Sequence, residues 1–187
     1  MKEDVIMRII SGKYKGKNII GYDIEGTRPT QDRVKESLFA MIQEDLIDSK
    51  VLDLFAGSGN LGIEALSNGA DTCYFVDKNK KCCDAINKNL IGIENGIVLN
   101  EDYNDALSYF KNNNIKFNLI FLDPPYNLDC LDDILNKIRE YNLLEESGLV
   151  ICEYEYDNFK EYSNLKIIKD KKYGYKNIRI YSYLKKA

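Results

Sequence analysis

From residue 50 onward the chain alternates short apolar runs with amphipathic segments, and this alternation constrains its fold more than any other feature. The apolar runs are nearly continuous, as in strands buried on both faces, and the segments between them have helical spacing. Repeated strand–helix units predict an α/β, Rossmann-like fold with a mostly parallel sheet between two helical layers. The expected strands are 50–56, 71–77, 96–100, 116–122 and 147–155, and the expected helices are 59–70, 78–93, 102–112 and 129–141.

The N-terminal part has a different pattern. Two β-rich runs, 7–10 and 18–22, flank a Gly-Lys-Tyr-Lys-Gly-Lys turn and predict a small hairpin. Residues 27–46 carry an apolar stripe at helical spacing, and Thr30 is a suitable N-cap. We therefore expect a β-hairpin followed by one helix.

The C-terminal part predicts a closing pair of antiparallel strands. The runs 164–174 and 176–184 are rich in β-branched and aromatic residues and meet at Gly174. They would complete a seven-stranded sheet. We divide the chain into an N-terminal extension, residues 1–46, and a main domain, residues 47–187.

Composition indicates a soluble globular protein, with 44% hydrophobic and 30% charged residues in a chain of 187. No apolar stretch approaches the roughly 18–20 residues of a membrane span. The N-terminus carries acids and no long apolar region, unlike a secretory signal. We expect a cytoplasmic protein.

The net charge of −4 hides a segregated distribution. Residues 1–35 hold eight basic and five acidic side chains, and residues 166–187 hold eight basic and one acidic. Local basic segments matter more for phosphate binding than the total charge does. Nucleic acid therefore remains a candidate partner.

The chain has no histidine, which excludes a Ser-His-Asp triad. Five cysteines occur without a CxxC spacing, so we expect no metal site and free thiols in a reducing compartment. They are Cys73, Cys82, Cys83, Cys130 and Cys152.

A glycine-rich loop follows the first strand of the main domain. Gly57, Gly59 and Gly62 match the G-x-G-x-x-G pattern between a strand and a helix, and Asp77 ends the next strand. The carboxyl ends of parallel strands are where such sheets bind ligands, and an acid in this position takes ribose hydroxyls. On its own the pattern fits NAD, a flavin or S-adenosylmethionine.

Three acids at successive strand ends favour S-adenosylmethionine. Asp53 precedes the glycines, Asp77 follows the second strand, and Asp102 follows the third, where it could accept from an adenine amino group. A pyrophosphate would be repelled by Asp53, whereas S-adenosylmethionine has no phosphate and carries an ammonium and a sulfonium. The structural alternative for each acid is a helix N-cap.

Asp123-Pro124-Pro125-Tyr126 follows the fourth strand at the same edge. The prolines stiffen the turn and donate no hydrogen bond, so the carboxylate of Asp123 and the carbonyl of Pro124 can both accept from a planar amine. Tyr126 offers a ring on which a base can stack. The motif predicts a site for the exocyclic amine of a nucleobase, with Asp123 or water taking the released proton.

Several blocks together resemble the bacterial RsmD family of 16S rRNA guanine-N2 methyltransferases. They are MRIISGKYKGK, TRPTQDRVKESLF, LDLFAGSGNLGIEALSNGA, FVDKN, FLDPPY and KKYG, and the resemblance runs from residue 7 to about 183. It implies a class I S-adenosylmethionine-dependent fold with a seven-stranded sheet and a small N-terminal extension. It also implies methylation of one guanine amine in 16S rRNA, on an assembled or nearly assembled small subunit.

The same resemblance implies roles for site residues. The cofactor would be held by Asp53, Gly57, Gly59, Asp77 and Asp102, with Thr30 and Arg33 near its methionine end; the target base would be held by Asp123, Pro124 and Tyr126. The chain departs from the family pattern at Asn60 and Asn68, where a small residue and an arginine are expected.

RNA contacts are expected from basic residues near an aromatic ring, which combine phosphate binding with stacking on an unpaired base. They are Lys13, Tyr14, Lys15, Arg28, Lys171 and Lys172. Because no large exposed apolar stripe is evident, we expect a monomer.

Three alternatives remain open from the residues alone. An N6-adenine methyltransferase would use the same Asp-Pro-Pro-Tyr chemistry, although such DNA enzymes usually carry a separate recognition region. A nicotinamide-dependent oxidoreductase would use the glycine loop and leave residues 123–126 unexplained. A non-catalytic RNA-binding assembly factor would keep only the fold.

Overall fold

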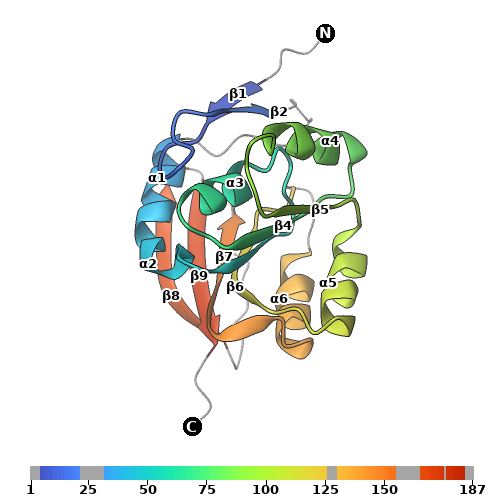
Figure 1. Ribbon diagram of the computed structural model, residues 1–187. Helices are drawn as coiled ribbons and strands as arrows, with labels where there is room; N and C mark the ends of the chain where they lie inside the picture. The colour runs from blue at the N-terminus through green and yellow to red at the C-terminus, as the bar shows by residue number, and fades with distance from the viewer. Residues whose placement is uncertain (1–4, 22–31, 126–129, 155–164, 175, 184–187) are drawn as a thin grey trace.

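The computed structural model describes residues 5–21, 32–125, 130–154, 165–174 and 176–183. Its centre is a seven-stranded sheet in the order β5-β4-β3-β6-β7-β9-β8 (Figure 1). Five strands run parallel, and β9 enters antiparallel between β7 and β8. The strands are β3 (Lys50–Asp53), β4 (Thr72–Val76), β5 (Gly96–Leu99), β6 (Phe117–Leu122), β7 (Leu144–Tyr154), β8 (Leu165–Tyr173) and β9 (Lys176–Tyr183).

The strand order creates a switch point. From β3 the chain winds outward through β4 and β5, and it then returns to the other side of β3 with β6. Loops that leave the carboxyl ends of β3 and β6 therefore lead to opposite sides of the switch point, which is the position at which open α/β sheets bind ligands. The fold places the glycine loop and Asp123 at this edge.

Helices cover both faces of the sheet (Figure 1). Apolar side chains of α1, α3 and α4 pack with one set of alternate strand residues, and those of α5 and α6 pack with the other set. This two-sided burial explains why the strand segments are almost uniformly apolar. The helices are α1 (Asp32–Met41), α2 (Gln43–Leu46), α3 (Asn60–Ser67), α4 (Lys80–Asn89), α5 (Tyr103–Asn112) and α6 (Leu131–Glu140).

The N-terminal hairpin consists of β1 (Val5–Arg8) and β2 (Asn18–Gly21), paired antiparallel. Ile9 and Ile19 are buried in the same core cluster as α1, α3 and α4. The turn of the hairpin approaches α3 closely, because a Cβ added to Gly12 would lie 1.9 Å from the carbonyl oxygen of Ser67. Only glycine permits this contact.

Several element bounds differ from the sequence prediction by up to four residues, and two of the differences have a clear physical reason. The helix expected over 27–46 is two helices in its described part, because Ile42 leaves helical geometry (φ −115°, ψ 13°) while its side chain is fully buried. Strand β7 begins at Leu144 instead of 147, through the exposed and polar Glu145 and Glu146. Because those acids face solvent, the sequence carries no apolar signal for this part of the strand.

Candidate functional site

The glycine loop connects β3 to α3. Gly57 (φ +57°) and Gly59 (φ +81°) have left-handed backbone, and Gly59 is the N-cap residue of α3. A Cβ added to Gly57 would meet no atom within 4 Å, whereas one added to Gly62 would lie 2.3 Å from the Phe75 ring. The left-handed backbone of the first two glycines thus shapes the loop, which is open at Gly57, and the third glycine lets α3 pack closely on β4.

Asp77 ties the glycine loop to the end of β4. Its Oδ2 accepts a hydrogen bond from the Gly57 N–H at 2.9 Å, and its Oδ1 accepts from the Asn79 N–H at 2.8 Å. Burial raises the pKa of Asp77, and these two hydrogen bonds oppose the shift. A side-chain hydrogen bond from Cys82 also opposes the shift. Since a carboxylate offers about four lone-pair positions, Asp77 retains acceptor capacity for a ribose hydroxyl.

Asp53 lies beneath the loop. It is 2% exposed, and its Oδ2 accepts from the Gly62 N–H, in the first turn of α3, at 2.9 Å. Burial, with a smaller contribution from Asp77, raises the pKa of Asp53 to about 7, although the Gly62 hydrogen bond opposes this. The raised pKa favours the protonated form of Asp53 relative to an ordinary aspartate, so it contributes less negative charge than the sequence suggests.

Asp102 is the N-cap residue of α5, and its Oδ1 accepts from the Asn104 N–H at 3.0 Å. Helix capping is the alternative to cofactor binding that the sequence left open for each of the three acids. The cap uses one carboxylate oxygen and is compatible with a second acceptor role. Because β5, β4 and β3 are neighbours, Asp102, Asp77 and Asp53 lie at or after the carboxyl ends of adjacent strands, at one edge of the sheet.

Asp123 follows β6, beside β3, and is half-buried together with Pro124 and Pro125. Burial raises the pKa of Asp123 well above its ordinary value, Glu153 raises it further, and Lys176 lowers it. Leu122 pairs with Cys152 in the parallel β6–β7 ladder, which places Glu153 next to Asp123. Glu153 and Lys176 form an ion pair with both side chains almost fully buried.

Glu153 and Lys176 are site residues that the sequence did not reveal. The available signal is that Glu153 directly follows the apolar run of β7, a position where a charge has to find a partner. In the sequence, Lys176 is indistinguishable from the other lysines of the basic C-terminal segment.

The predicted RNA contacts fall into two groups within the described residues. Lys13, Tyr14 and Lys15 lie together in the turn of the hairpin, where the Lys13 Nζ is 5.2 Å from the centroid of the Tyr14 ring. Lys171 and Lys172 are exposed on the edge strand β8. Because they are consecutive in a strand, their Cβ atoms point to opposite faces of the sheet, and their role in RNA binding stays a prediction.

Three predicted site residues, Arg28, Thr30 and Tyr126, lie outside the described residues. Arg33 is exposed in the first turn of α1.

A buried polar cluster near the glycine loop was not expected. Lys35 and Glu64 form an ion pair of 3.0 Å with both side chains fully buried. The two asparagines that depart from the family pattern belong to this cluster, since Asn60 accepts from Lys35 and Asn68 donates to Glu64. Lys35 follows Val34 and precedes Leu38 on the apolar stripe of α1, which is the signal that could have revealed it.

Comparison with known proteins agrees with this architecture. The family model described as "Conserved hypothetical protein 95" matches residues 7–182. "Putative rRNA methyltransferase YlbH" of Bacillus subtilis is 39% identical over 180 residues, covering 94% of this chain and 98% of that protein. "Ribosomal RNA small subunit methyltransferase D" of Haemophilus influenzae is 34% identical over 180 residues, covering 94% and 93%.

A solved structure, "Putative methyltransferase yhhF from Escherichia coli", superposes with a TM-score of 0.84 at 31% identity, covering 96% of this chain and 98% of that one. The expected methyltransferase fold is thereby confirmed. The chain belongs to the family described as "Conserved hypothetical protein 95", and the resemblance seen in its motifs is confirmed as well.

Proposed function

We propose that this protein transfers a methyl group from S-adenosylmethionine to the exocyclic N2 amine of a guanine in 16S rRNA. The family match and the rRNA methyltransferases among its relatives support this activity. We further propose that the substrate is the assembled or nearly assembled small subunit, and that the protein acts as a monomer in the cytoplasm. No helix in the described part of the chain has the length and apolarity needed to cross a bilayer.

One observation carries the proposal: the glycine loop and Asp123 leave the carboxyl ends of adjacent strands, β3 and β6, at the switch point of the sheet. A cofactor held by the first would therefore lie beside an amine held by the second. S-adenosylmethionine supplies an electrophilic methyl group on its sulfonium.

The residues at the loop fit this cofactor. Gly57 leaves room for close approach of the cofactor to the backbone, Gly59 provides the left-handed backbone at the start of α3, and Asp77 and Asp102 supply acceptors for ribose hydroxyls and an adenine amine. Asp53 contributes indirectly, because it accepts a hydrogen bond from the Gly62 N–H and so fixes the start of α3. Arg33, with Thr30, remains our proposal for the methionine end.

At the target side, Asp123 and the Pro124 carbonyl would accept both hydrogens of the guanine amine, and Tyr126 would stack on the base. The amine is a poor nucleophile because its lone pair is delocalised into the ring. Two acceptors raise the electron density on nitrogen and fix its direction of attack, so positioning and electrostatics account for most of the rate. The N–C bond forms as the C–S bond breaks, and the amine proton passes to Asp123 or to water.

The test is methyl transfer from labelled S-adenosylmethionine. Unmodified small subunits, naked 16S rRNA and duplex DNA are offered in parallel, and the products are digested to nucleosides. N2-methylguanosine from the subunits is the expected result. N6-methyladenine would keep the chemistry of residues 123–126 but overturn the proposed substrate, and absence of label with demonstrated cofactor binding would favour a non-catalytic role.

A further inference from the structure

Two buried polar side chains lie between the N-terminal hairpin and the glycine loop. Lys35 of α1 is fully buried, and Asn89 of α4 is 3% exposed. Neither belongs to a predicted site, and both make hydrogen bonds to backbone of the hairpin.

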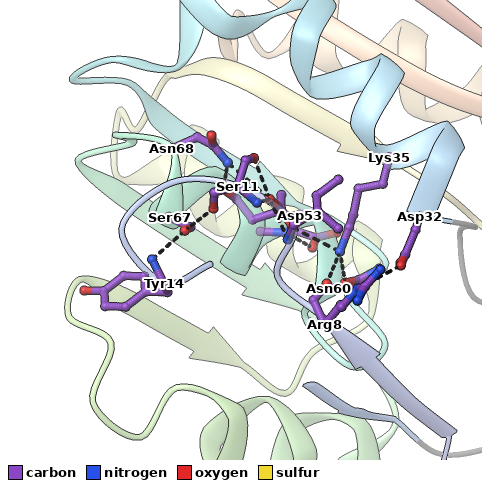
Figure 2. Close-up of polar contacts among 12 residues, drawn as sticks. Arg8, Ser11, Tyr14, Asp32, Lys35, Asp53, Asn60, Ser67 and Asn68 are labelled. Carbon is purple, nitrogen blue, oxygen red and sulfur yellow. Dashed lines mark hydrogen bonds and ion pairs between the residues drawn. The ribbon is translucent and has the colours of Figure 1, made fainter. Parts of the chain in front are cut away.

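Lys35 connects the first strand of the hairpin to the start of α3 (Figure 2). Its Nζ donates to the Arg8 carbonyl at the end of β1 at 2.7 Å, and to the Asn60 Oδ1 at 2.8 Å. Its charge is balanced by Glu64, which itself accepts from the backbone N–H groups of Ile10 and Ser11. The ammonium is thus fixed by partners on both elements.

Asn89 makes the matching connection from the second strand. Its Oδ1 accepts from the Ile20 N–H at 3.0 Å, and its Nδ2 donates to the Ile20 carbonyl at 2.8 Å. The same Nδ2 donates to the Ser58 carbonyl in the glycine loop at 2.9 Å. Asn89 therefore links the backbone of β2 to the backbone of the glycine loop.

The two connections meet on either side of one residue. Ser58 and Asn60 are the neighbours of Gly59, whose φ of +81° sets the direction in which α3 begins. Lys35 hydrogen-bonds to Asn60 and to β1, and Asn89 hydrogen-bonds to Ser58 and to β2. A buried donor that loses its acceptor is costly, so neither connection loosens without a loss of free energy.

We propose that Lys35 and Asn89 are positioning residues that couple the N-terminal hairpin to the cofactor loop. Cofactor binding and docking of the hairpin then strengthen each other, because coupling between two sites is reciprocal. A substrate that contacts the hairpin would raise the affinity for the cofactor. This inference depends on the proposed use of the glycine loop as the cofactor site.

The test compares Asn60→Ala and Asn89→Leu with Ser67→Ala. Ser67 also anchors the hairpin, by donating to the Ser11 carbonyl and accepting from the Tyr14 N–H, but it does so at the far end of α3. Binding of S-adenosylhomocysteine is measured by calorimetry, and the KM for S-adenosylmethionine and kcat are measured on the substrate. Backbone hydrogen exchange of the hairpin is followed with and without S-adenosylhomocysteine.

We expect Asn60→Ala and Asn89→Leu to raise the Kd about 5- to 30-fold, because each removes one buried hydrogen bond made at a neighbour of Gly59, and to raise KM while kcat changes little. In the wild type, S-adenosylhomocysteine should slow exchange at Ile10, Ser11 and Ile20, and the two variants should reduce this protection. Ser67→Ala should lower the Tm and leave the Kd unchanged. Asn60→Ala keeps Lys35 paired with Glu64 and Arg8, so it remains informative if Asn89→Leu folds poorly.

A wild-type protein that binds S-adenosylhomocysteine with no change in hairpin exchange would overturn the coupling, as would variants that match Ser67→Ala in affinity. In either case the proposed function stands. A wild-type protein that binds no S-adenosylhomocysteine would overturn both the cofactor site and the coupling.

Discussion

At the glycine-loop edge the acids accept hydrogen bonds from backbone N–H groups, whereas at the end of β6 the acid lies beside a second carboxylate and a lysine. Asp53, Asp77 and Asp102 are each bonded to an N–H of a loop or helix start. Burial raises the pKa of Asp123, Glu153 on β7 raises it further, and Lys176 on β9 lowers it. Backbone hydrogen bonds fix the geometry of a carboxylate as well as lowering its pKa, whereas neighbouring charges act on its protonation alone. We therefore propose that the cofactor half depends mainly on geometry and that the target half depends also on the charges beside Asp123.

The largest expected effect comes from Asp123→Ala. Loss of an acceptor that acts on the reacting amine should lower kcat by about 10²- to 10³-fold and leave the Kd of S-adenosylhomocysteine unchanged. Asp77→Ala should do the opposite and raise the cofactor KM with a smaller change in kcat. Single-turnover methylation measures the effect on the chemical step, and calorimetry measures the effect on cofactor affinity. A loss of cofactor binding in Asp123→Ala would show that Asp123 belongs to the cofactor site and not to the target site.

Lys176→Met tests the role of charge at the target half. Removing the cation that lowers the Asp123 pKa raises that pKa further, so the acidic limb of the kcat–pH profile should move to higher pH. Glu153→Gln removes the neighbouring carboxylate and should move the limb to lower pH. The Lys176→Met variant also leaves Glu153 buried without the lysine charge, at a cost of about 3–5 kcal/mol, so profiles are recorded well below its Tm.

The double variant Lys176→Met/Glu153→Gln is the control for that cost. It should recover stability and return the acidic limb toward its wild-type position. Identical kcat–pH profiles in all three variants would show that the protonation state of Asp123 does not limit the rate.

Asp53→Asn tests whether the cofactor half depends on charge at all. Burial raises the pKa of Asp53 from 3.8 to about 7. Because the folded state binds this proton more tightly than the unfolded state, its contribution to stability is present at low pH and is lost as pH rises through about 7. The variant, which keeps an acceptor for Gly62, should show a smaller fall in the free energy of unfolding between pH 5 and 8. Urea denaturation measures it, and an unchanged slope would assign the pH dependence to another group.

The smallest effect is expected at the hairpin turn. Lys13→Glu and Lys15→Glu should weaken RNA binding and reduce the slope of log K against log salt by about 0.7–0.9 for each phosphate that the variant no longer neutralises. Lys111→Glu, an exposed change on α5 at the opposite face of the sheet, serves as the control. Equal slopes in all variants would remove the hairpin from the RNA interface.

Much of the fold follows from local pattern, because β3 to β6 and their helices each bury a continuous apolar run or stripe. The position of the glycine loop and of Asp123 at one edge follows from the same pattern together with the rule for parallel sheets. What could not be predicted depends on contacts between distant segments. Lys35 and Glu64 are 29 positions apart in sequence, and Glu153 and Lys176 are 23 apart. A single buried charge carries no local indication of which distant charge will balance it.

The place of β9 in the sheet has a consequence for the order of synthesis. It is the last strand in sequence order, yet it lies inside the sheet between β7 and β8 and brings Lys176 to Glu153. When β7 of a nascent chain has left the ribosome and β9 has not, Asp123 and Glu153 are neighbours without the positive charge of Lys176. The target half of the site acquires its working charge only when the final strand is inserted, so an incomplete chain could fold its cofactor loop before it becomes competent for methyl transfer.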